Sequence, residues 1–375
     1  CGQSCQLTYK TFIMKKSPAN FLASQDFAKV AQATFDTLEA IQIKNRWGYV
    51  AARAGWTVEM VFHEGDTAAV RQRAWQVVDL FCEVVGPENL ALWWSGKPTA
   101  LTAKFAQNQI AKYKPITLEN PNGFAMIFRM ASGTPTPARQ WVENAQDFYL
   151  EVCIDNEDGL WMHERRSPGT GPMMSYIRAA LPLKWIRQQP AERNAAWLTE
   201  RMVALMQPFW CTAGWGVVPA VNEDNIASSL SHGQQALYPV LQRFPGLNAI
   251  AGQALFRAQF NDALPSVNWL TYVSKPLLDK LGGKAGVLGR IKTSKYLAGL
   301  DLGHSLCVVA GGFPMLGDAE LGVTLPPYGE AARLLKPARA PDVLNQFVAP
   351  PPSGSADAAA WQQACQTYLR RFDDY

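Results

Sequence analysis

A strand–helix–strand pattern that occurs twice constrains the fold of this chain more than any other feature of its sequence. In the first copy, the half-buried strand WTVEMVF at 56–62 precedes a helix at 67–85 and the apolar strand LALWW at 90–94. Gly86-Pro87 ends that helix. Its apolar residues recur at helical spacing on one face: Val70, Ala74, Val77, Val78, Phe81 and Val85.

The second copy begins with the strand FYLEVCI at 148–154, where Glu151 takes the position that Glu59 has in the first copy. After an insertion come a helix at 191–206 and the aromatic strand FWCTAGWGV at 209–217. The two units predict an α+β protein with mixed or antiparallel sheets and flanking helices, as an internal duplication would give.

We divide the chain into three regions. We expect an N-terminal α+β region at 1–140, a main domain at 141–348, and a linker with a final helix at 349–375. The linker is the Pro- and Ser-rich stretch APPPSGSA at 349–356. The helix at 357–371 is predicted to dock on the protein, because its apolar residues share one face: Trp361, Cys365, Tyr368 and Phe372.

Charge and cysteine usage narrow the class of protein. The net charge of +4, from 35 basic and 31 acidic residues, is too small to indicate a nucleic-acid partner. No apolar run is long enough for a membrane span. The seven cysteines are scattered without a CxxC pair, which favours a reduced cytoplasmic protein. A start at Cys1-Gly2 fits either a trimmed chain, which we favour, or a lipoprotein after signal cleavage.

Motifs for catalysis are absent from the sequence. There is no GxSxG, GxxxxGK[ST], GxGxxG or HExxH, so the common hydrolase, phosphate-binding and zinc-protease signatures are not supported. The densest groupings that could bind a metal follow the first strand of each unit. A metal-dependent hydrolase built from them is the alternative hypothesis, and its residues would be His63, Glu64, Asp66, His163 and Glu164.

Acidic residues gather between 143 and 164, where no Lys or Arg interrupts them. The Asp/Asn/Gly-rich turn at 155–159 is predicted to be exposed, which favours binding over catalysis because nothing there would raise a carboxyl pKa by burial. Asp155, Glu157 and Asp158 are therefore the candidate binding residues for a basic partner. The 13 tryptophans are a second possible source of interface anchors.

The C-terminal third carries five ordered submotifs. They are Asn268-Trp269-Leu270-Thr271, then PLLxxLGG at 276–283, Gly317-Asp318, LPPY at 325–328, and ARLLxPxR at 332–339. In these motifs the chain resembles the type VI secretion immunity family, whose members are similar to cognate inhibitors of nuclease toxins with a restriction-endonuclease-like fold. The resemblance is strongest over 265–340.

The resemblance implies an immunity protein rather than an enzyme, with no cofactor, no metal, no direct contact to nucleic acid and no membrane. The implied partner is a secreted, DNA-cleaving nuclease effector, neutralised in the cytoplasm by occlusion of its active cleft or by blocking its oligomerisation. An endonuclease cleft must be basic to hold phosphates, so the acidic turn at Asp155, Glu157 and Asp158 is a suitable contact.

The family motifs themselves have structural explanations. We expect Ser274 to cap a helix whose first turn holds Pro276, and Gly282 to end it in the left-handed conformation. Pro326-Pro327 should start the next helix, from which Arg333 is expected to reach Asp318. The motifs are then scaffold, and the partner-binding surface lies elsewhere.

Overall fold

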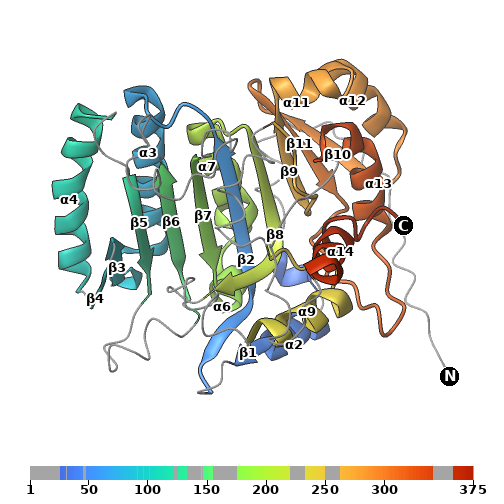
Figure 1. Ribbon diagram of the computed structural model, residues 1–375, viewed down its shortest axis with the longest axis horizontal. Coiled ribbons are helices and arrows are strands. Elements are labelled where there is room, and N and C mark those ends of the chain that lie inside the picture. Colours follow the sequence, from blue (N-terminus) through green and yellow to red (C-terminus); the bar gives the residue numbers. More distant parts are fainter. Residues whose placement is uncertain are drawn as a thin grey trace.

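The computed structural model describes residues 26–30, 32–44, 48–90, 92–95, 97–100, 102–121, 126–132, 145, 147–154, 175–219, 233–249, 262–340 and 358–374. These residues form a broad sheet with helices packed around it (Figure 1). Across these ranges, no helix has both the length and the apolarity needed to cross a bilayer.

The strands are β1 (Gln42–Lys44), β2 (Val50–Phe62), β3 (Leu92–Ser95), β4 (Lys97–Ala100), β5 (Met126–Ala131), β6 (Tyr149–Ile154), β7 (Ser175–Leu181), β8 (Trp210–Pro219), β9 (Leu270–Ser274), β10 (Leu297–Asp301) and β11 (Ser305–Ala310). Within the described residues they join in one 11-stranded sheet of order β10-β11-β9-β8-β2-β7-β6-β5-β3-β4, with β1 paired to β2. The strand pairs of this sheet are antiparallel.

The helices are α2 (Gln32–Ala40), α3 (Ala68–Val85), α4 (Ala103–Glu119), α6 (Leu183–Gln188), α7 (Ala195–Met206), α9 (Gly233–Arg243), α11 (Lys275–Lys280), α12 (Gly283–Thr293), α13 (Pro326–Leu335) and α14 (Ala358–Leu369). Short 3-10 turns are η1 (Phe27–Lys29), η2 (Pro87–Asn89), η4 (Ala191–Arg193) and η6 (Lys336–Ala338).

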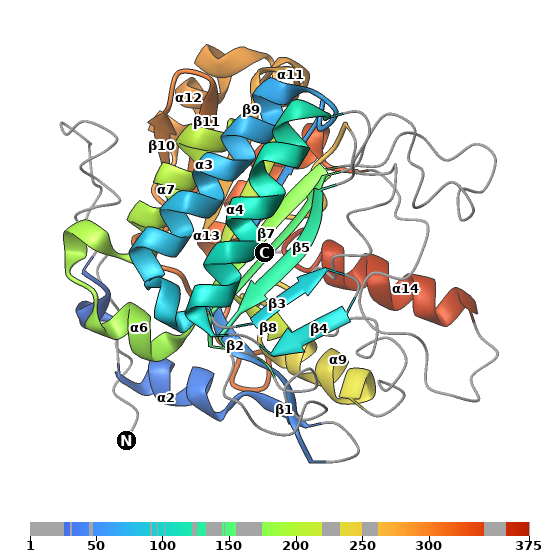
Figure 2. The same ribbon diagram turned by 90° about the vertical axis from the view of Figure 1, so that its left-hand side faces the viewer.

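Helices α3 and α7 pack together on one face of the sheet, with α4 beside α3, and α14 lies on the other side (Figure 2). On the helix-covered face, Trp56 of β2 donates from Nε1 to Thr199 Oγ1 of α7 at 3.1 Å. The Trp75 ring of α3 stacks on Phe128 of β5 with ring centroids 5.4 Å apart. Large apolar side chains between the two layers make this the main core.

Several of the tryptophans belong to this core. The rings of Trp56, Trp215 and Trp269 meet edge to face, as do those of many buried aromatic pairs. The tryptophans with fully buried side chains are Trp56, Trp75, Trp210, Trp215 and Trp269. These five tryptophans therefore serve the core and are not available as interface anchors.

The predicted α+β class is confirmed, but the two units share one sheet instead of forming separate sheets. Strand β2 of the first unit lies between β8 of the second unit and β7, which comes from the predicted insertion. The predicted strand at 56–62 starts earlier, at Val50, and the predicted helix at 191–206 begins at Ala195 after a 3-10 turn. The boundaries at 140 and 348 stay a prediction.

The ends of two helices test the capping residues that the sequence predicts. At α3, Thr67 Oγ1 accepts from the Val70 N–H, and Gly86 ends the helix with φ +84°, as expected. At α11, Gly282 has the predicted positive φ, of +83°. Ser274 occupies the cap position, but its side chain makes no capping hydrogen bond, so that prediction is wrong. The proline in the first turn of α11 fixes the backbone there without it.

Candidate functional site

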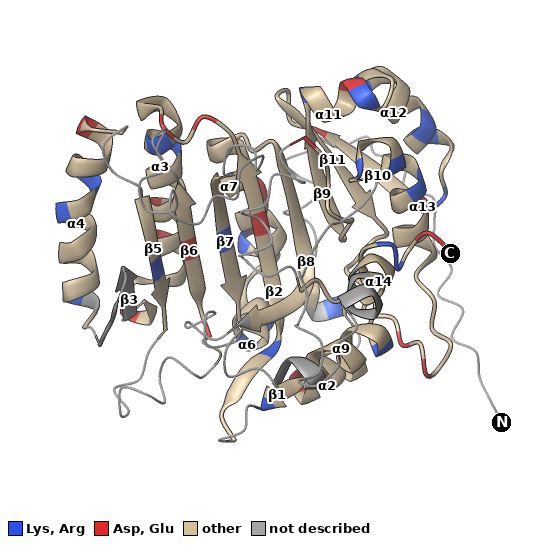
Figure 3. Ribbon diagram, viewed as in Figure 1, with Lys and Arg blue, Asp and Glu red and all other residues tan. Residues whose placement is uncertain are grey.

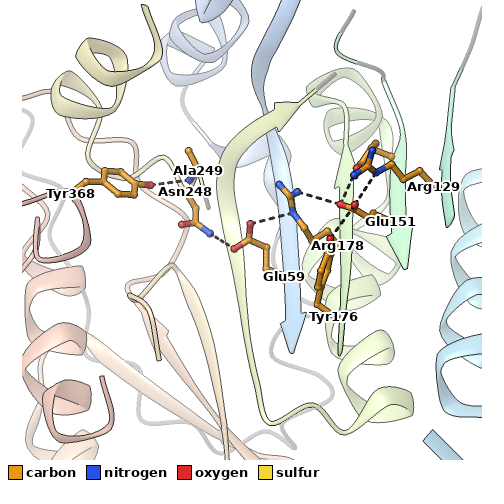
Figure 4. Close-up of polar contacts among 9 residues, drawn as sticks. Glu59, Arg129, Glu151, Tyr176, Arg178, Asn248, Ala249 and Tyr368 are labelled. Atoms are coloured by element: carbon orange, nitrogen blue, oxygen red, sulfur yellow. Dashed lines mark hydrogen bonds and ion pairs between the residues drawn. The ribbon is translucent and has the colours of Figure 1, made fainter. Parts of the chain in front are cut away.

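Four charged side chains form a row across the middle of the sheet. Arg129 of β5, Glu151 of β6, Arg178 of β7 and Glu59 of β2 lie directly opposite one another in the strand registers. Arg129 Nε is 2.8 Å from Glu151 Oε1, and Arg178 Nη1 is 3.3 Å from Glu151 Oε2. Arg178 Nε is 3.6 Å from Glu59 Oε1. Figure 4 shows this charge row, and Figure 3 places acidic and basic residues side by side on the middle strands.

The charge row is almost closed to solvent. The Glu151 side chain is 3% exposed and the Arg178 side chain 8%. Glu151 also accepts from the hydroxyls of Tyr149, at 3.0 Å, and Tyr176, at 3.1 Å. Burial alone would raise the pKa of Glu151, but the guanidiniums of Arg129 and Arg178 and the hydrogen bonds outweigh it, so its pKa is lowered. The carboxylate is therefore ionised at neutral pH.

The alternation of side chains along each strand places the row on the face opposite α3 and α7. In β2, Trp56 contacts α7, and Glu59 is an odd number of positions further on, so it points the other way. The same rule puts Tyr149 beside Glu151 on β6 and Tyr176 beside Arg178 on β7. Each strand thus carries apolar residues to the helices and a charge to the opposite face.

Asn248 extends the row beyond the sheet. Its Nδ2 donates to Glu59 Oε2 at 3.1 Å, and its side chain is buried. Its backbone pairs with β8: Asn248 N–H donates to Trp215 O at 2.9 Å and Val217 N–H donates to Asn248 O at 2.8 Å. A Cβ on Gly216 would lie 2.8 Å from Asn248 O, so glycine permits this close approach.

Residues 243–249, which we call the hub segment, are held from the other side by α14 and the residues after it. The Tyr368 hydroxyl accepts from the Ala249 N–H at 2.9 Å and donates to Leu247 O at 2.9 Å. Arg371 Nε donates to Pro245 O at 2.7 Å. Tyr368 and Phe372 are buried, as expected if the final helix docks on the protein.

The hub segment also fixes the Gly317-Asp318 motif. Arg243 Nη2 lies 3.1 Å from Asp318 Oδ2, and Ala319 N–H donates to Arg243 O at 2.7 Å. Burial would raise the pKa of Asp318, but the hydrogen bonds from Arg243 and from backbone N–H groups lower it. The ion pair that we expected from Arg333 is thus made by Arg243 of α9, which reaches Asp318 from the hub segment.

A match to a known protein family identifies the class of protein that has this fold. The model of the TsiV family, described as type VI immunity for VRR-NUC, matches residues 144–372. The chain belongs to the TsiV family. The family resemblance inferred from the submotifs is therefore confirmed, and the TsiV match reaches well beyond them on both sides.

A solved structure shares the fold of this TsiV chain. The Pseudomonas aeruginosa T6SS protein PA0821 is similar to it with a TM-score of 0.69 and 18% sequence identity, over 91% of this chain and 90% of that one. No curated protein matches the sequence. The structural similarity therefore extends over the residues before 144, which the family match leaves out.

The matched region supplies most of the network. Within 144–372 lie Glu151, Arg178, the hub segment and the Asp318 motif, whereas Glu59 and Arg129 come from the preceding residues. The two charges inside the match, Glu151 and Arg178, pair with each other. Strands that precede the match add a second partner to each, Arg129 beside Glu151 and Glu59 beside Arg178.

The predicted binding residues Asp155, Glu157 and Asp158 lie outside the described residues. They follow directly on β6, which ends at Ile154, three positions after Glu151. The charge row thus fixes the strand that leads into the acidic turn. Nothing in the described geometry assigns these three residues a partner.

Only one half of the alternative hydrolase site can be located. His63 is exposed at the end of β2, with its ring 4.6 Å from that of Phe209. Glu64 and Asp66 follow in the turn before α3, whereas His163 and Glu164 lie outside the described residues. In the described part of the chain, no three His, Cys, Asp or Glu side chains are grouped so that they could hold a metal ion.

The buried thiols are in an unreactive form. Burial raises the pKa of Cys82 to about 12, and burial likewise raises the pKa of Cys211 and of Cys307. A thiol with a raised pKa stays protonated at neutral pH and is a poor nucleophile. Cys211 and Cys307 therefore act as small core residues, and the partly buried Cys82 packs against the core.

The sequence contains an indication of the charge row that hydrophobic periodicity does not reveal. Four apolar strand segments each carry one charge: TVEMV, MIFRMA, YLEVCI and SYIRAAL. A lone charge inside an apolar strand must be paired once it is buried, and two acidic with two basic strands can pair with each other. On that basis, the two acidic residues could have been predicted to pair with the two basic ones.

Proposed function

We propose that this TsiV chain is an immunity protein that binds a VRR-NUC nuclease effector and blocks it without catalysing a reaction. The family match over 144–372 carries the proposal, because the family is described by that partner. The low reactivity of the buried thiols is in keeping with a binding role, and no cofactor or metal is invoked. The cytoplasm is the proposed place of action, since the DNA to be protected is there.

Occlusion of the active cleft is the proposed mode of inhibition. A nuclease holds DNA largely through cations that contact phosphates, and a carboxylate surface can compete for those cations. Asp155, Glu157 and Asp158 are the proposed contacts, because three carboxylates follow closely in the sequence on the fixed strand β6, in a stretch predicted to be an exposed turn. Complementary charge also speeds association and disfavours wrong partners.

The acidic contact predicts the effect of charge reversal. We expect Asp155→Lys, Glu157→Lys and Asp158→Lys together to weaken binding of the effector by more than about tenfold, because attraction becomes repulsion. Titration calorimetry with a catalytically inactivated VRR-NUC effector from the same genome measures the effect.

A matched control variant distinguishes the effect of these three positions from the effect of the altered net charge. Lysine at Glu39, Glu119 and Glu192, three exposed carboxylates from other parts of the chain, changes the net charge by the same amount. We expect that variant to bind like the wild type. Equal affinities for all three proteins would rule out the acidic turn as a contact while leaving an immunity role intact.

The absence of catalysis has its own test. Metal analysis of the purified chain should find no stoichiometric zinc or manganese. A stoichiometric metal that Ala at His63 and His163 removes would contradict the proposal and support the hydrolase hypothesis instead.

A further inference from the structure

One short loop between β11 and α13 exposes apolar side chains that the fold does not use. Among the described residues, the exposed large hydrophobic side chains are Phe105, Ile116, Leu321 and Val323. Leu321, at 74%, is the most exposed of these, and Val323 is 49% exposed. We call residues 318–324 the tip loop. Single exposed apolar residues are common, so the conformation of this loop decides whether the pair is significant.

The backbone of the tip loop is fixed by its own hydrogen bonds. Asp318 and Val323 pair as an antiparallel bridge, with N–H to O distances of 3.1 and 2.8 Å. Asp318 Oδ1 accepts from the N–H groups of Glu320, at 3.0 Å, and Leu321, at 3.3 Å. Gly322 has φ +67°, a conformation that glycine adopts without strain, and its N–H donates to Ala319 O.

The tip loop is also fastened to the rest of the protein. Arg243 of the hub segment holds Asp318 through Nη2 and Glu320 through Nη1, the latter at 2.8 Å from Oε2. Gly246 N–H donates to Leu316 O at 2.8 Å just before the loop. The Tyr328 hydroxyl accepts from the Met315 N–H at 3.2 Å. The loop is therefore tied to the hub segment and, through it, to the charge row.

A rigid loop with an apolar tip has the properties of a binding anchor. Ordering a flexible loop opposes association, and this loop is already ordered in the free chain. An apolar side chain that enters a pocket of the partner gains burial that the free protein does not provide. Glu320, with 65% of its side chain exposed, lies beside Leu321 and can face a cation at the rim of such a pocket.

We propose that the tip loop is a contact for the nuclease effector, with Leu321 and Val323 in an apolar pocket and Glu320 against a basic residue at its rim. This inference rests on the proposed function and adds a second contact to it. The occupant is taken to be the effector because the loop lies within the matched region of a family described by that partner. A nuclease surface rich in phosphate-binding cations also suits an apolar tip flanked by a carboxylate.

The test is Leu321→Asp, with Ile116→Asp as its matched control. Ile116 is an exposed apolar residue on α4, at the far end of the sheet from α13 and outside the matched region (Figure 1). In calorimetry with the inactivated VRR-NUC effector, we expect Leu321→Asp to weaken binding by at least about tenfold. Ile116→Asp should bind like the wild type, and both variants should melt like it.

Each outcome separates the two proposals. If the wild type does not bind the nuclease, the proposed function fails. If the wild type binds and Leu321→Asp binds equally well, only the tip-loop proposal is overturned. Light scattering provides a second readout: a dimer of the chain that Leu321→Asp dissociates would show that a second copy occupies the tip, and would also overturn the proposal.

Discussion

Glu151 lies in the protein interior between the guanidinium groups of Arg129 and Arg178. The carboxylate pairs with both, and two tyrosine hydroxyls complete its hydrogen bonding. Buried ion pairs add little net stability when whole, yet the loss of one member leaves a charge in a low-dielectric interior. We therefore infer that the charge row acts mainly on specificity: it determines which strands pair and in which register.

Glu151→Ala should lower the free energy of unfolding by about 3–5 kcal/mol, because the buried Arg178 and the partly buried Arg129 lose their shared carboxylate. Urea denaturation measures the change. Glu39→Ala is the control, since Glu39 is half exposed and pairs with Arg187 at 3.6 Å. It should change stability by less than about 0.5 kcal/mol. Similar losses for the two variants would contradict the assigned role of the row.

The lowered pKa of Glu151 adds a pH signature to the same experiment. As the pH falls, the unfolded chain takes up this proton before the folded chain does. The contribution of Glu151 is thus fully present above the ordinary carboxyl pKa and is lost as the pH falls through the lowered folded value. The free energy of unfolding of the wild type should decline more steeply with acidification than that of Glu151→Gln. Parallel curves for the two proteins would argue against a lowered pKa of Glu151 in the folded chain.

At the residue scale, the sequence predicted part of the charge row. The alignment of the two units matched Glu59 with Glu151, and the structure places both against Arg178. The sequence did not predict Arg178 as their shared partner because β7 lies in what was taken for an insertion. The positions of Asp155, Glu157 and Asp158 stay a prediction.

The hub segment is the element that joins the sheet to the tip loop. Its glycine is needed for packing, because a Cβ on Gly246 would overlap the backbone carbonyl oxygens of Met315 and Leu316. Backbone atoms cannot move aside as a flexible side chain can. The hub segment therefore tolerates little change at this position.

Gly246→Ala should cost about 1–3 kcal/mol of stability through overpacking. Gly286→Ala is the control, since Gly286 lies within α12 and a Cβ there would meet nothing within 4 Å. That substitution should instead stabilise by about 0.5–1 kcal/mol, because alanine suits a helix better than glycine. Thermal and urea unfolding measure both, and a neutral Gly246→Ala would show that the hub segment can shift.

Elements with clear periodicity and stop signals were predicted well. Helix α3 agrees with the prediction to within one residue at its start, since Thr67 and Gly86-Pro87 mark both ends. Strand β7 was not predicted, because SYIRAAL is short and its arginine interrupts the apolar run. Ser274 shows that a residue suited to capping does not always form the cap when proline already sets the backbone.

At the scale of the molecule, the sequence predicted the α+β class and the family but not the single sheet. Which strands pair depends on contacts between distant residues, such as β2 with β8, and local patterns do not contain that information. The similarity to the Pseudomonas aeruginosa T6SS protein PA0821 at 18% identity shows that the arrangement persists with few shared residues.

Inhibition of DNA cleavage tests the central claim most directly. A purified VRR-NUC effector from the same genome is titrated with the wild-type chain while cleavage of duplex DNA is followed. The account predicts that cleavage stops at equimolar chain and that the two proteins co-elute as a complex. Undiminished cleavage at a large molar excess of folded chain, with no complex formed, would contradict it.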